Sequence, residues 1–374
     1  MWLIDRYIVR RFLANFFILL IMLFVFAVSI DLLLELDEFV EVARDTVGPD
    51  GGFVAQVIAL IGVVANFHGP RLFQFYAYML GLLSVGSMGF TLAQMHRHRE
   101  LVALLASGVR LHRIALPILG AALGLNLIQL ANQELVLPRL APLLIRSHGD
   151  IGQQGAKTFD VRFTSDGKGN LLQAPSFDPT TDTLELPTFL ERDEAGRTVR
   201  RITADRATWD ESARAWILVG GRAITPQSSA AGTTAVLRGQ PVDRYPTDLG
   251  PNILKMRQYR EYATMLSITQ IGQMRRSPGV VNEDALVRFA LARFSTVLIN
   301  MVVLVMVLPY FLLRQPASLL RNSLLCAGTA IPAMLGALMG FAVQFPGIPP
   351  AVSVFLPALV LLPVMLYMVS RIKT

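Results

Sequence analysis

Charged residues are scarce in this chain and unevenly placed. Only 16% of its 374 residues are Asp, Glu, Lys or Arg, and 53% are hydrophobic, whereas soluble domains carry about 25% charged residues. Long runs without any charge alternate with ordinary polar sequence. This pattern excludes a chain that is soluble throughout and indicates several membrane-spanning helices.

Cysteine pairs, phosphate-binding loops and metal-ligand clusters are also missing. The one cysteine, Cys326, allows no intrachain disulfide and no multi-cysteine metal site. Gly167-Lys168-Gly169 lacks the rest of a G-x-x-x-x-G-K-[ST] motif, so we expect no ATP hydrolysis by this chain. His96, His98 and His112 lie in a basic loop and indicate a charged membrane interface rather than a metal site. We therefore expect no catalytic site, metal or cofactor in this chain.

Several apolar runs are long enough to cross a bilayer, which takes about 20 helical residues. They are 12–34, whose only charge is Asp31, and the charge-free runs 72–95, 114–133, 294–313 and 322–370. The last run holds two helices, divided by turn residues at 345–350. The apolar run 53–65 is too short to cross, so we expect an interfacial or kinked approach that breaks at 66–70. The sequence therefore predicts six spans.

Basic and acidic residues separate between the segments that join these spans. The N-terminus, the loops after the second and fourth spans, and the C-terminal tail are all basic, whereas the loop 35–52 is acidic. With six spans the four basic segments lie on one side of the membrane. The positive-inside rule then places both termini in the cytoplasm.

The polar insert at about 140–260 predicts a mostly β domain outside the membrane. Short stretches rich in β-branched and aromatic residues alternate with turn signals such as Asp166-Gly167 and Asp178-Pro179. This regular spacing favours a sandwich or jelly roll. We expect strands at 158–164, 170–174, 183–190, 198–207, 215–224 and 233–237, and then an amphipathic helix at 255–275 that leads into the fourth span.

The sequence predicts a short amphipathic helix in the loop after the second span. Leu101, Leu104 and Leu105 recur at helical spacing, and Gly108 is a natural stop. Glu100 lies at the helix N-terminus, where the dipole favours a carboxylate. The segment is therefore either a lipid-surface helix that joins two spans or a coupling helix for a cytoplasmic partner. In the first case Glu100 only caps its helix and pairs with a neighbouring arginine.

Four segments match one family of membrane proteins. They are Ile4-Asp5-Arg6-Tyr7-Ile8, the stretch 99–118 with Glu100 and Gly108, Ala204–Trp209 followed by Trp216-Ile217-Leu218, and Gly347-Ile348-Pro349-Pro350. By these segments, nearly the whole chain resembles the LptF/LptG (YjgP/YjgQ) permeases of the lipopolysaccharide export ABC transporter. The end of the first span, residues 29–39, is more similar to LptG.

The resemblance implies an α-helical membrane protein with six transmembrane helices and an inserted extracytoplasmic β-jelly-roll domain. The expected boundaries are 1–138 for spans one to three, with the coupling helix near 97–108; 139–260 for the periplasmic jelly roll; and 261–374 for a connecting helix and spans four to six. It implies a non-enzymatic permease subunit in the inner membrane. Such a subunit extracts lipopolysaccharide or a related lipid and passes it to a periplasmic bridge.

The resemblance also implies partners. They are a paralogous permease subunit, a dimeric cytoplasmic ATPase that uses ATP and Mg²⁺, periplasmic jelly-roll bridge proteins and the lipid, with no nucleic acid.

Two other interpretations stay open from the sequence: a membrane scaffold or sensor that does not transport, and a membrane enzyme. A scaffold would not need a helix with an acidic N-terminus and an apolar face in the 96–113 loop.

Candidate site residues fall into three groups. By the resemblance, Glu100 faces the ATPase, and the coupling group is Glu100, Leu101, Leu104, Leu105, Gly108, Arg97 and Arg99. The resemblance also implies a lateral gate or lipid cavity at the outer ends of spans one and five, with Val28, Asp31, Leu32, Met334 and Phe341. In the β domain, strand residues either line an apolar groove for lipid or form a sandwich core: Phe159, Val161, Phe163 and Leu186.

Overall fold

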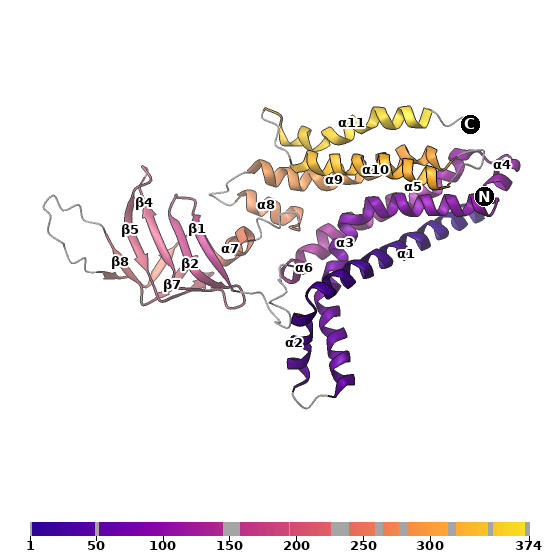
Figure 1. The fold of residues 1–374 in the computed structure, drawn as a ribbon. Coiled ribbons are helices and arrows are strands. Elements are labelled where there is room, and N and C mark those ends of the chain that lie inside the picture. Colours follow the sequence, from indigo (N-terminus) through magenta and orange to yellow (C-terminus); the bar gives the residue numbers. More distant parts are fainter. Residues whose placement is uncertain are drawn as a thin grey trace. The chain divides into compact units, whose positions relative to one another are not determined.

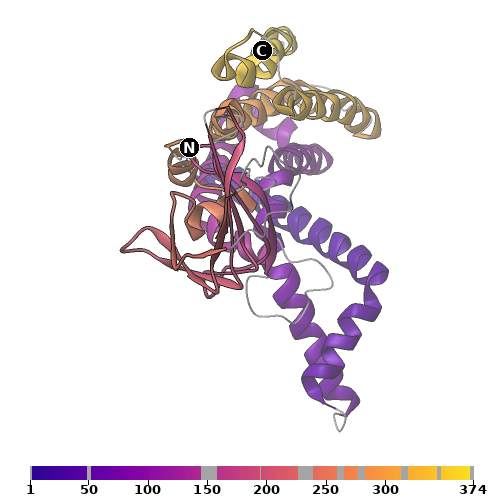
Figure 2. The ribbon, with the colours of Figure 1, turned by 90° about the vertical axis from the view of Figure 1, so that its left-hand side faces the viewer.

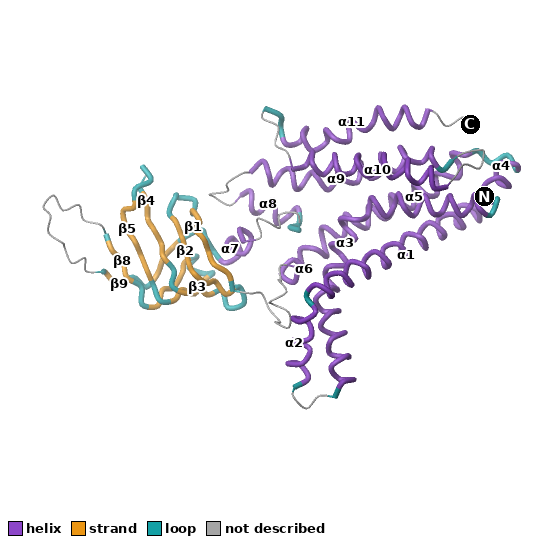
Figure 3. Tube along the Cα trace, viewed as in Figure 1, coloured by secondary structure: helices purple, strands orange, loops and turns teal. Residues whose placement is uncertain are grey.

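The chain folds into two compact units, shown in the computed structural model of Figure 1. The structure describes residues 2–48, 52–144, 158–193, 195–225, 239–258, 265–276, 283–312, 319–342 and 347–370. The first unit, Met1–Leu140 with Val287–Thr374, is helical. The second, Ala141–Leu286, holds all the described strands (Figure 3). We call them the helical unit and the β domain.

The six predicted spans are confirmed within the described residues. Six helical stretches are long and apolar enough to cross a membrane: Leu3–Leu34, Phe53–Arg97, Leu111–Ala141, Asp284–Tyr310, Arg321–Phe341 and Pro350–Ser370. The first three stretches correspond to α1 (Trp2–Leu34), to α3 (Phe53–Arg97), and to α5 (Leu111–Ala131) followed by η1 (Asn132–Val136) and α6 (Leu137–Leu144). The last three correspond to α9 (Glu283–Val307) followed by η4 (Leu308–Tyr310), to α10 (Leu319–Ala342), and to α11 (Pro350–Ser370).

Two expectations for the segment 35–70 were wrong. Residues Leu36–Val47 form a helix, α2, rather than a loop, and α3 continues through Pro70 without the expected break. The two helices form a hairpin (Figure 1), in which the buried Phe39 ring contacts the rings of Phe67 and His68 with centroids 5.5 and 5.8 Å apart. This packing offsets the cost of about 3 kcal/mol for a proline inside a helix.

The core of the helical unit is built from one face of each helix. In α1 the buried residues Ile8, Phe12 and Phe16 recur every fourth position, whereas Ile18 and Ile21 on another face are 62% and 60% exposed. The buried face packs against α3 and α5. Exposed aliphatic side chains on a spanning helix are the surface expected to contact lipid.

The β domain is one antiparallel sheet of ten short strands with the order β10-β7-β6-β3-β2-β4-β5-β8-β9, and β1 also pairs with β2. The strands are β1 (Phe159–Ser165), β2 (Leu171–Asp178), β3 (Thr183–Glu185), β4 (Thr188–Arg192), β5 (Thr198–Thr203), β6 (Arg206–Asp210), β7 (Ala215–Val219), β8 (Arg222–Ile224), β9 (Gln240–Pro241) and β10 (Arg244–Pro246). The sheet confirms the predicted inserted β domain.

Three expected strands are each divided in two. The stretch 183–190 breaks at Leu186, whose φ is +48°, and 215–224 breaks at Gly220, whose φ is +69°. Residues 204–205 likewise separate β5 from β6. A positive φ turns the chain out of the extended conformation, which accounts for the breaks at Leu186 and Gly220. The expected strand at 233–237 lies outside the described residues. The expectation of a single helix at 255–275 was wrong, because α7 (Pro251–Gln258) and α8 (Ile268–Arg276) are separate helices and the described residues 265–267 are not helical.

These breaks let the sheet fold over on itself. One part of β2 pairs with β3, which leads to β6, β7 and β10, and the other part pairs with β4, which leads to β5, β8 and β9. Tyr245 of β10 and Phe189 of β4 belong to different arms, yet their ring centroids are 4.3 Å apart. The two arms therefore enclose a core that includes Trp216, Phe177 and Ile202. The strands lie toward the viewer in Figure 2.

Candidate functional site

The expected short helix in the loop after the second span is α4 (Glu100–Ala106). It lies at the same end of the helical unit as the N-terminus (Figure 1). Arg99 precedes it with φ +59°, and Gly108 follows it with φ +84°. Both residues adopt the left-handed conformation, which glycine enters without strain. Two sharp turns therefore isolate α4 from the long helices α3 and α5.

The leucines of α4 face their own chain. Leu101 is fully buried in the core of the helical unit, and Leu104 and Leu105 are half-buried against the same core. Leu101 therefore has no surface to offer a partner in this conformation. The exposed face of α4 consists instead of Val102, Ala103 and Ala106 and is followed by Ser107 and Gly108.

Glu100 is bound to α1. Its Oε2 accepts a hydrogen bond from Nη1 of Arg11 at 2.6 Å and another from the hydroxyl of Tyr7 at 3.0 Å. Nε of Arg11 also donates to Oε1 of Gln94 in α3, at 3.2 Å. We call Tyr7, Arg11, Gln94 and Glu100 the clamp. Among the described contacts, the ion-pair partner of Glu100 is Arg11, rather than the neighbouring Arg97 or Arg99 that the lipid-surface interpretation expected.

Further polar contacts join the helices at this end. Asp5 of α1 accepts a hydrogen bond from Nη2 of Arg113 in α5 at 2.7 Å. The imidazole Nε2 of His96 in α3 lies 2.8 Å from the carbonyl oxygen of Phe311. These contacts, together with the clamp, hold the ends of α1, α3, α4 and α5 in one arrangement.

The two halves of the expected lateral gate are separated within one chain. Val28, Asp31 and Leu32 lie at the far end of α1, where Oδ2 of Asp31 is 3.4 Å from Nε2 of His68. Met334 and Phe341 lie on α10 and pack against the core. α3 contacts both α1 and α10, and Figures 1 and 2 show it between them.

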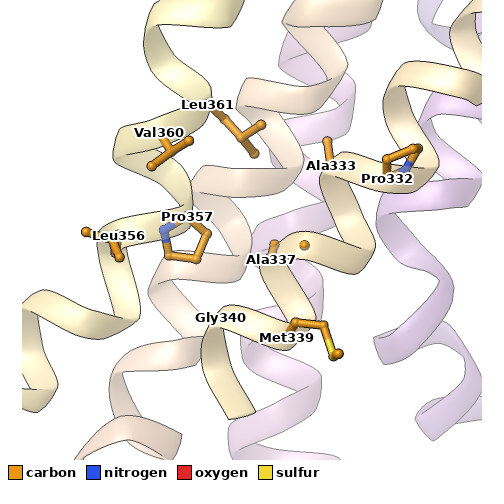
Figure 4. Close-up of a pocket in the computed structure, with 10 residues that line it drawn as sticks. Pro332, Ala333, Ala337, Met339, Gly340, Leu356, Pro357, Val360 and Leu361 are labelled. Carbon is orange, nitrogen blue, oxygen red and sulfur yellow. The ribbon is translucent and has the colours of Figure 1, made fainter. Parts of the chain in front are cut away.

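An apolar groove of about 400 Å³ lies beside this second group, between α10 and α11 (Figure 4). Gly340 makes the two helices meet closely, because a Cβ there would collide with the ring of Pro357, while Gly336 faces open space. The groove residues are Pro332, Ala333, Gly336, Ala337, Met339, Gly340, Leu356, Pro357, Val360 and Leu361. The spacing of Gly336 and Gly340 is the sequence signal for such a close helix contact.

The four candidate groove residues of the β domain do not share a surface. Val161 is buried in the core, and the Phe159 ring packs against Phe177 with centroids 5.2 Å apart. Phe163 and Leu186 are 56% and 60% exposed. A register shift between Val161 and Thr164 adds one residue to β1, and such a bulge reverses the side-chain alternation that follows it.

Polar contacts of α9 with η1 and α5 escaped the sequence analysis. Nη1 of Arg293 donates to Oε2 of Glu134 at 2.7 Å, and the Arg293 side chain is only 2% exposed. Deeper in the unit, the amide of Asn300 donates to Oδ1 of Asn126 at 3.0 Å. The charge-free run 114–133 ends directly before Glu134, and the run 294–313 begins directly after Arg293. Counting charges therefore placed both residues outside the spans.

Together these features define a multi-pass membrane protein with an inserted β domain and a short helix between its second and third spans. Within the described ranges, no three His, Cys, Asp or Glu side chains cluster as metal ligands would. The model of the family "Lipopolysaccharide export system permease LptF/LptG" matches residues 71–371. The chain therefore belongs to the LptF/LptG family, and its class is that of a lipid-export permease rather than an enzyme. Comparison with curated proteins gave no match.

Proposed function

We propose that this chain is the permease subunit of an ABC-type exporter that extracts lipopolysaccharide or a related lipid from the inner membrane and passes it to a periplasmic bridge. The observation that carries the proposal is α4, a short helix fixed to the core by Leu101 and to α1 by the clamp, with its small apolar face exposed. A separate cytoplasmic ATPase, supplied with ATP and Mg²⁺, would dock on this face.

The charge of the joining segments supports this orientation. The α4 end carries Arg97, Arg99, Arg110 and Arg113. α2, at the far end of α1, carries Asp37, Glu38, Glu41 and Asp45 against Arg44 alone. The positive-inside rule then places α4 in the cytoplasm and the β domain in the periplasm. Docking of a cytoplasmic ATPase on α4 therefore tests the orientation as well as the function.

Changes on the exposed side of α4 are expected to release the ATPase. Val102→Asp places a charge in the apolar face, and Glu100→Lys reverses the only acidic group of the helix. Each should weaken ATPase association by about ten- to a hundredfold, since the loss of a charged or buried contact costs about 1–3 kcal/mol. Co-purification of the ATPase with the full-length permease from membranes measures this.

The matched control for Val102→Asp is Val199→Asp. The two valines are 48% and 47% exposed, and Val199 lies in the β domain. The control variant should retain the ATPase. If Val102→Asp and Glu100→Lys also retain it and export lipid normally, α4 is a lipid-surface helix and the proposed function fails.

The lipid entrance is proposed to form only when two permease subunits meet. Within one chain α3 lies between the outer end of α1 and α10. The gate residues on α1 and those on α10 therefore do not meet to form a lipid entrance. The α10–α11 groove offers hydrocarbon surface on the α10 side. A paralogous subunit that places its own α1 beside this α10 would complete the entrance.

Photocrosslinkers at Val28 and Met339 are expected to trap the lipid substrate or the partner permease in membranes. Met339 is 68% exposed beside the groove, and Val28 is half-buried near the outer end of α1. A crosslinker at Leu116, which is 53% exposed near the α4 end of α5, serves as the control and should trap bulk phospholipid only. Equal products at all three positions would contradict a localised entrance.

A further inference from the structure

The clamp joins the coupling helix to α1, the longest described helix of the helical unit that contains neither glycine nor proline. α1 runs for 33 residues from Trp2 to Leu34 and contains neither glycine nor proline. At 1.5 Å per residue it is about 50 Å long. By contrast α3, α5, α10 and α11 each contain proline, and proline is the usual site at which a helix bends. A displacement at one end of α1 is therefore expected to reach its other end.

The clamp is strong enough to carry such a displacement. Arg11 and Glu100 are 2.6 Å apart, and their side chains are only 20% and 30% exposed. A hydrogen bond between two charged groups is stronger than one between neutral groups, and partial burial protects it from screening by salt. Asp5 and Arg113 add a second contact between α1 and α5, 2.7 Å long, at the same end.

The clamp also leaves Glu100 able to bind a partner. Arg11 and Tyr7 both contact Oε2, and a carboxylate offers about four acceptor positions on its two oxygens. A basic group on a docked protein can therefore bond to Oε1 while the link to α1 persists.

We propose that Arg11, assisted by Tyr7, is a positioning residue that passes movement of the coupling helix to α1 and along it to the outer end at Val28, Asp31 and Leu32. The inference rests on the proposed docking of an ATPase on α4. It adds that α1 responds to the ATPase directly, through side chains that lie 89 positions apart in the sequence, and not only through the chain connection of α4 to α3 and α5.

The test uses the complete permease–ATPase complex reconstituted in vesicles with lipopolysaccharide. In the Arg11→Ala complexes that retain the ATPase, the lipid released per ATP hydrolysed should fall about tenfold, the factor for 1.4 kcal/mol. Arg10→Ala is the matched control, because Arg10 is an exposed arginine on the same helix; it should behave like the parent. Tyr7→Phe should lower the ratio less than Arg11→Ala does.

A second readout reports the movement itself. Spin labels at the exposed residues Ser29 and Val352, with the buried Cys326 replaced by alanine, measure the distance from the outer end of α1 to α11. This distance should change with ATP in the parent and in Arg10→Ala, and should stay constant in Arg11→Ala. If the Arg11→Ala protein does not accumulate in membranes, the same measurements on Tyr7→Phe decide whether the clamp passes the movement to α1. Tyr7→Phe removes only a hydroxyl group.

The outcomes separate the two proposals. Normal ATPase association in the Glu100→Lys and Val102→Asp variants would overturn the proposed function. The role of the clamp alone would be overturned by a different combination. In it, the Glu100→Lys and Val102→Asp variants lose the ATPase, but the Arg11→Ala or Tyr7→Phe protein keeps a normal release ratio and a normal ATP-dependent distance change. A distance that does not respond to ATP in the parent would overturn it too.

Discussion

The Glu134→Ala variant is expected to lose about 3 kcal/mol of stability, at the lower end of the 3–5 kcal/mol for breaking a buried ion pair. Arg293 is the buried partner, with a side chain 2% exposed, whereas the Glu134 side chain is 30% exposed. Without the carboxylate, the guanidinium keeps its charge in an environment of low polarity. Thermal unfolding of the purified permease in detergent, or its level in membranes, measures the loss.

The double variant Glu134→Leu with Arg293→Leu provides the control. Replacing both members of a buried pair with apolar residues is often neutral, because the cost of removing two charges from water disappears with them. The double variant should therefore recover most of the stability lost in Glu134→Ala. Equal instability in the single and double variants would show that the pair stabilises the protein through packing between η1 and α9 and not through its charges.

The Trp216→Ala variant is expected to unfold the β domain while the helical unit remains inserted. Trp216 is fully buried, and its Nε1 donates to the carbonyl oxygen of Leu249 at 2.9 Å. Its ring also contacts the ring of Phe177, with centroids 6.4 Å apart. Truncating a buried tryptophan costs about 3–5 kcal/mol, a large share of the stability of a small domain. Limited proteolysis of the full-length protein in membranes should then cleave within 158–258.

Trp209→Ala is the matched control for this prediction. Trp209 is the cross-strand neighbour of Trp216 in the β6–β7 pairing but is only half-buried, and its Nε1 bonds to Glu211 on the surface. Its loss should leave the β domain resistant to protease at temperatures where Trp216→Ala is cleaved. Equal sensitivity of the two variants would contradict the assignment of Trp216 to the centre of the core.

Composition and periodicity were sufficient to predict the classes of structure in this chain. The six spans follow from charge-free runs, because a charge in hydrocarbon is costly wherever the rest of the chain lies. The inserted β domain follows from turn residues, which act locally through their own backbone preferences. α4 follows from the spacing of its leucines and from Gly108, and those signals also lie within one segment.

The sequence was less informative where neighbours decide the outcome. An amphipathic pattern shows which face of α4 is apolar but not what covers it, and the structure turns Leu101 toward its own chain. α2 and the unbroken α3 stabilise each other through Phe39 and Phe67, so neither was evident alone. Phe163 was grouped with Val161 as a candidate groove residue, but the bulge in β1 between Val161 and Thr164 interrupts the side-chain alternation, and Phe163 is exposed.

The chain's own sequence thus determined how many helices are apolar enough to cross the membrane, where the β domain is inserted and which loop carries the short helix α4. Only the tertiary structure showed that Glu100 pairs with Arg11, 89 positions away, and Glu134 with Arg293, 159 positions away. A hydrogen bond forms only between groups about 3 Å apart. Packing of the helices brings these groups to that distance, and a local sequence pattern does not predict such a contact.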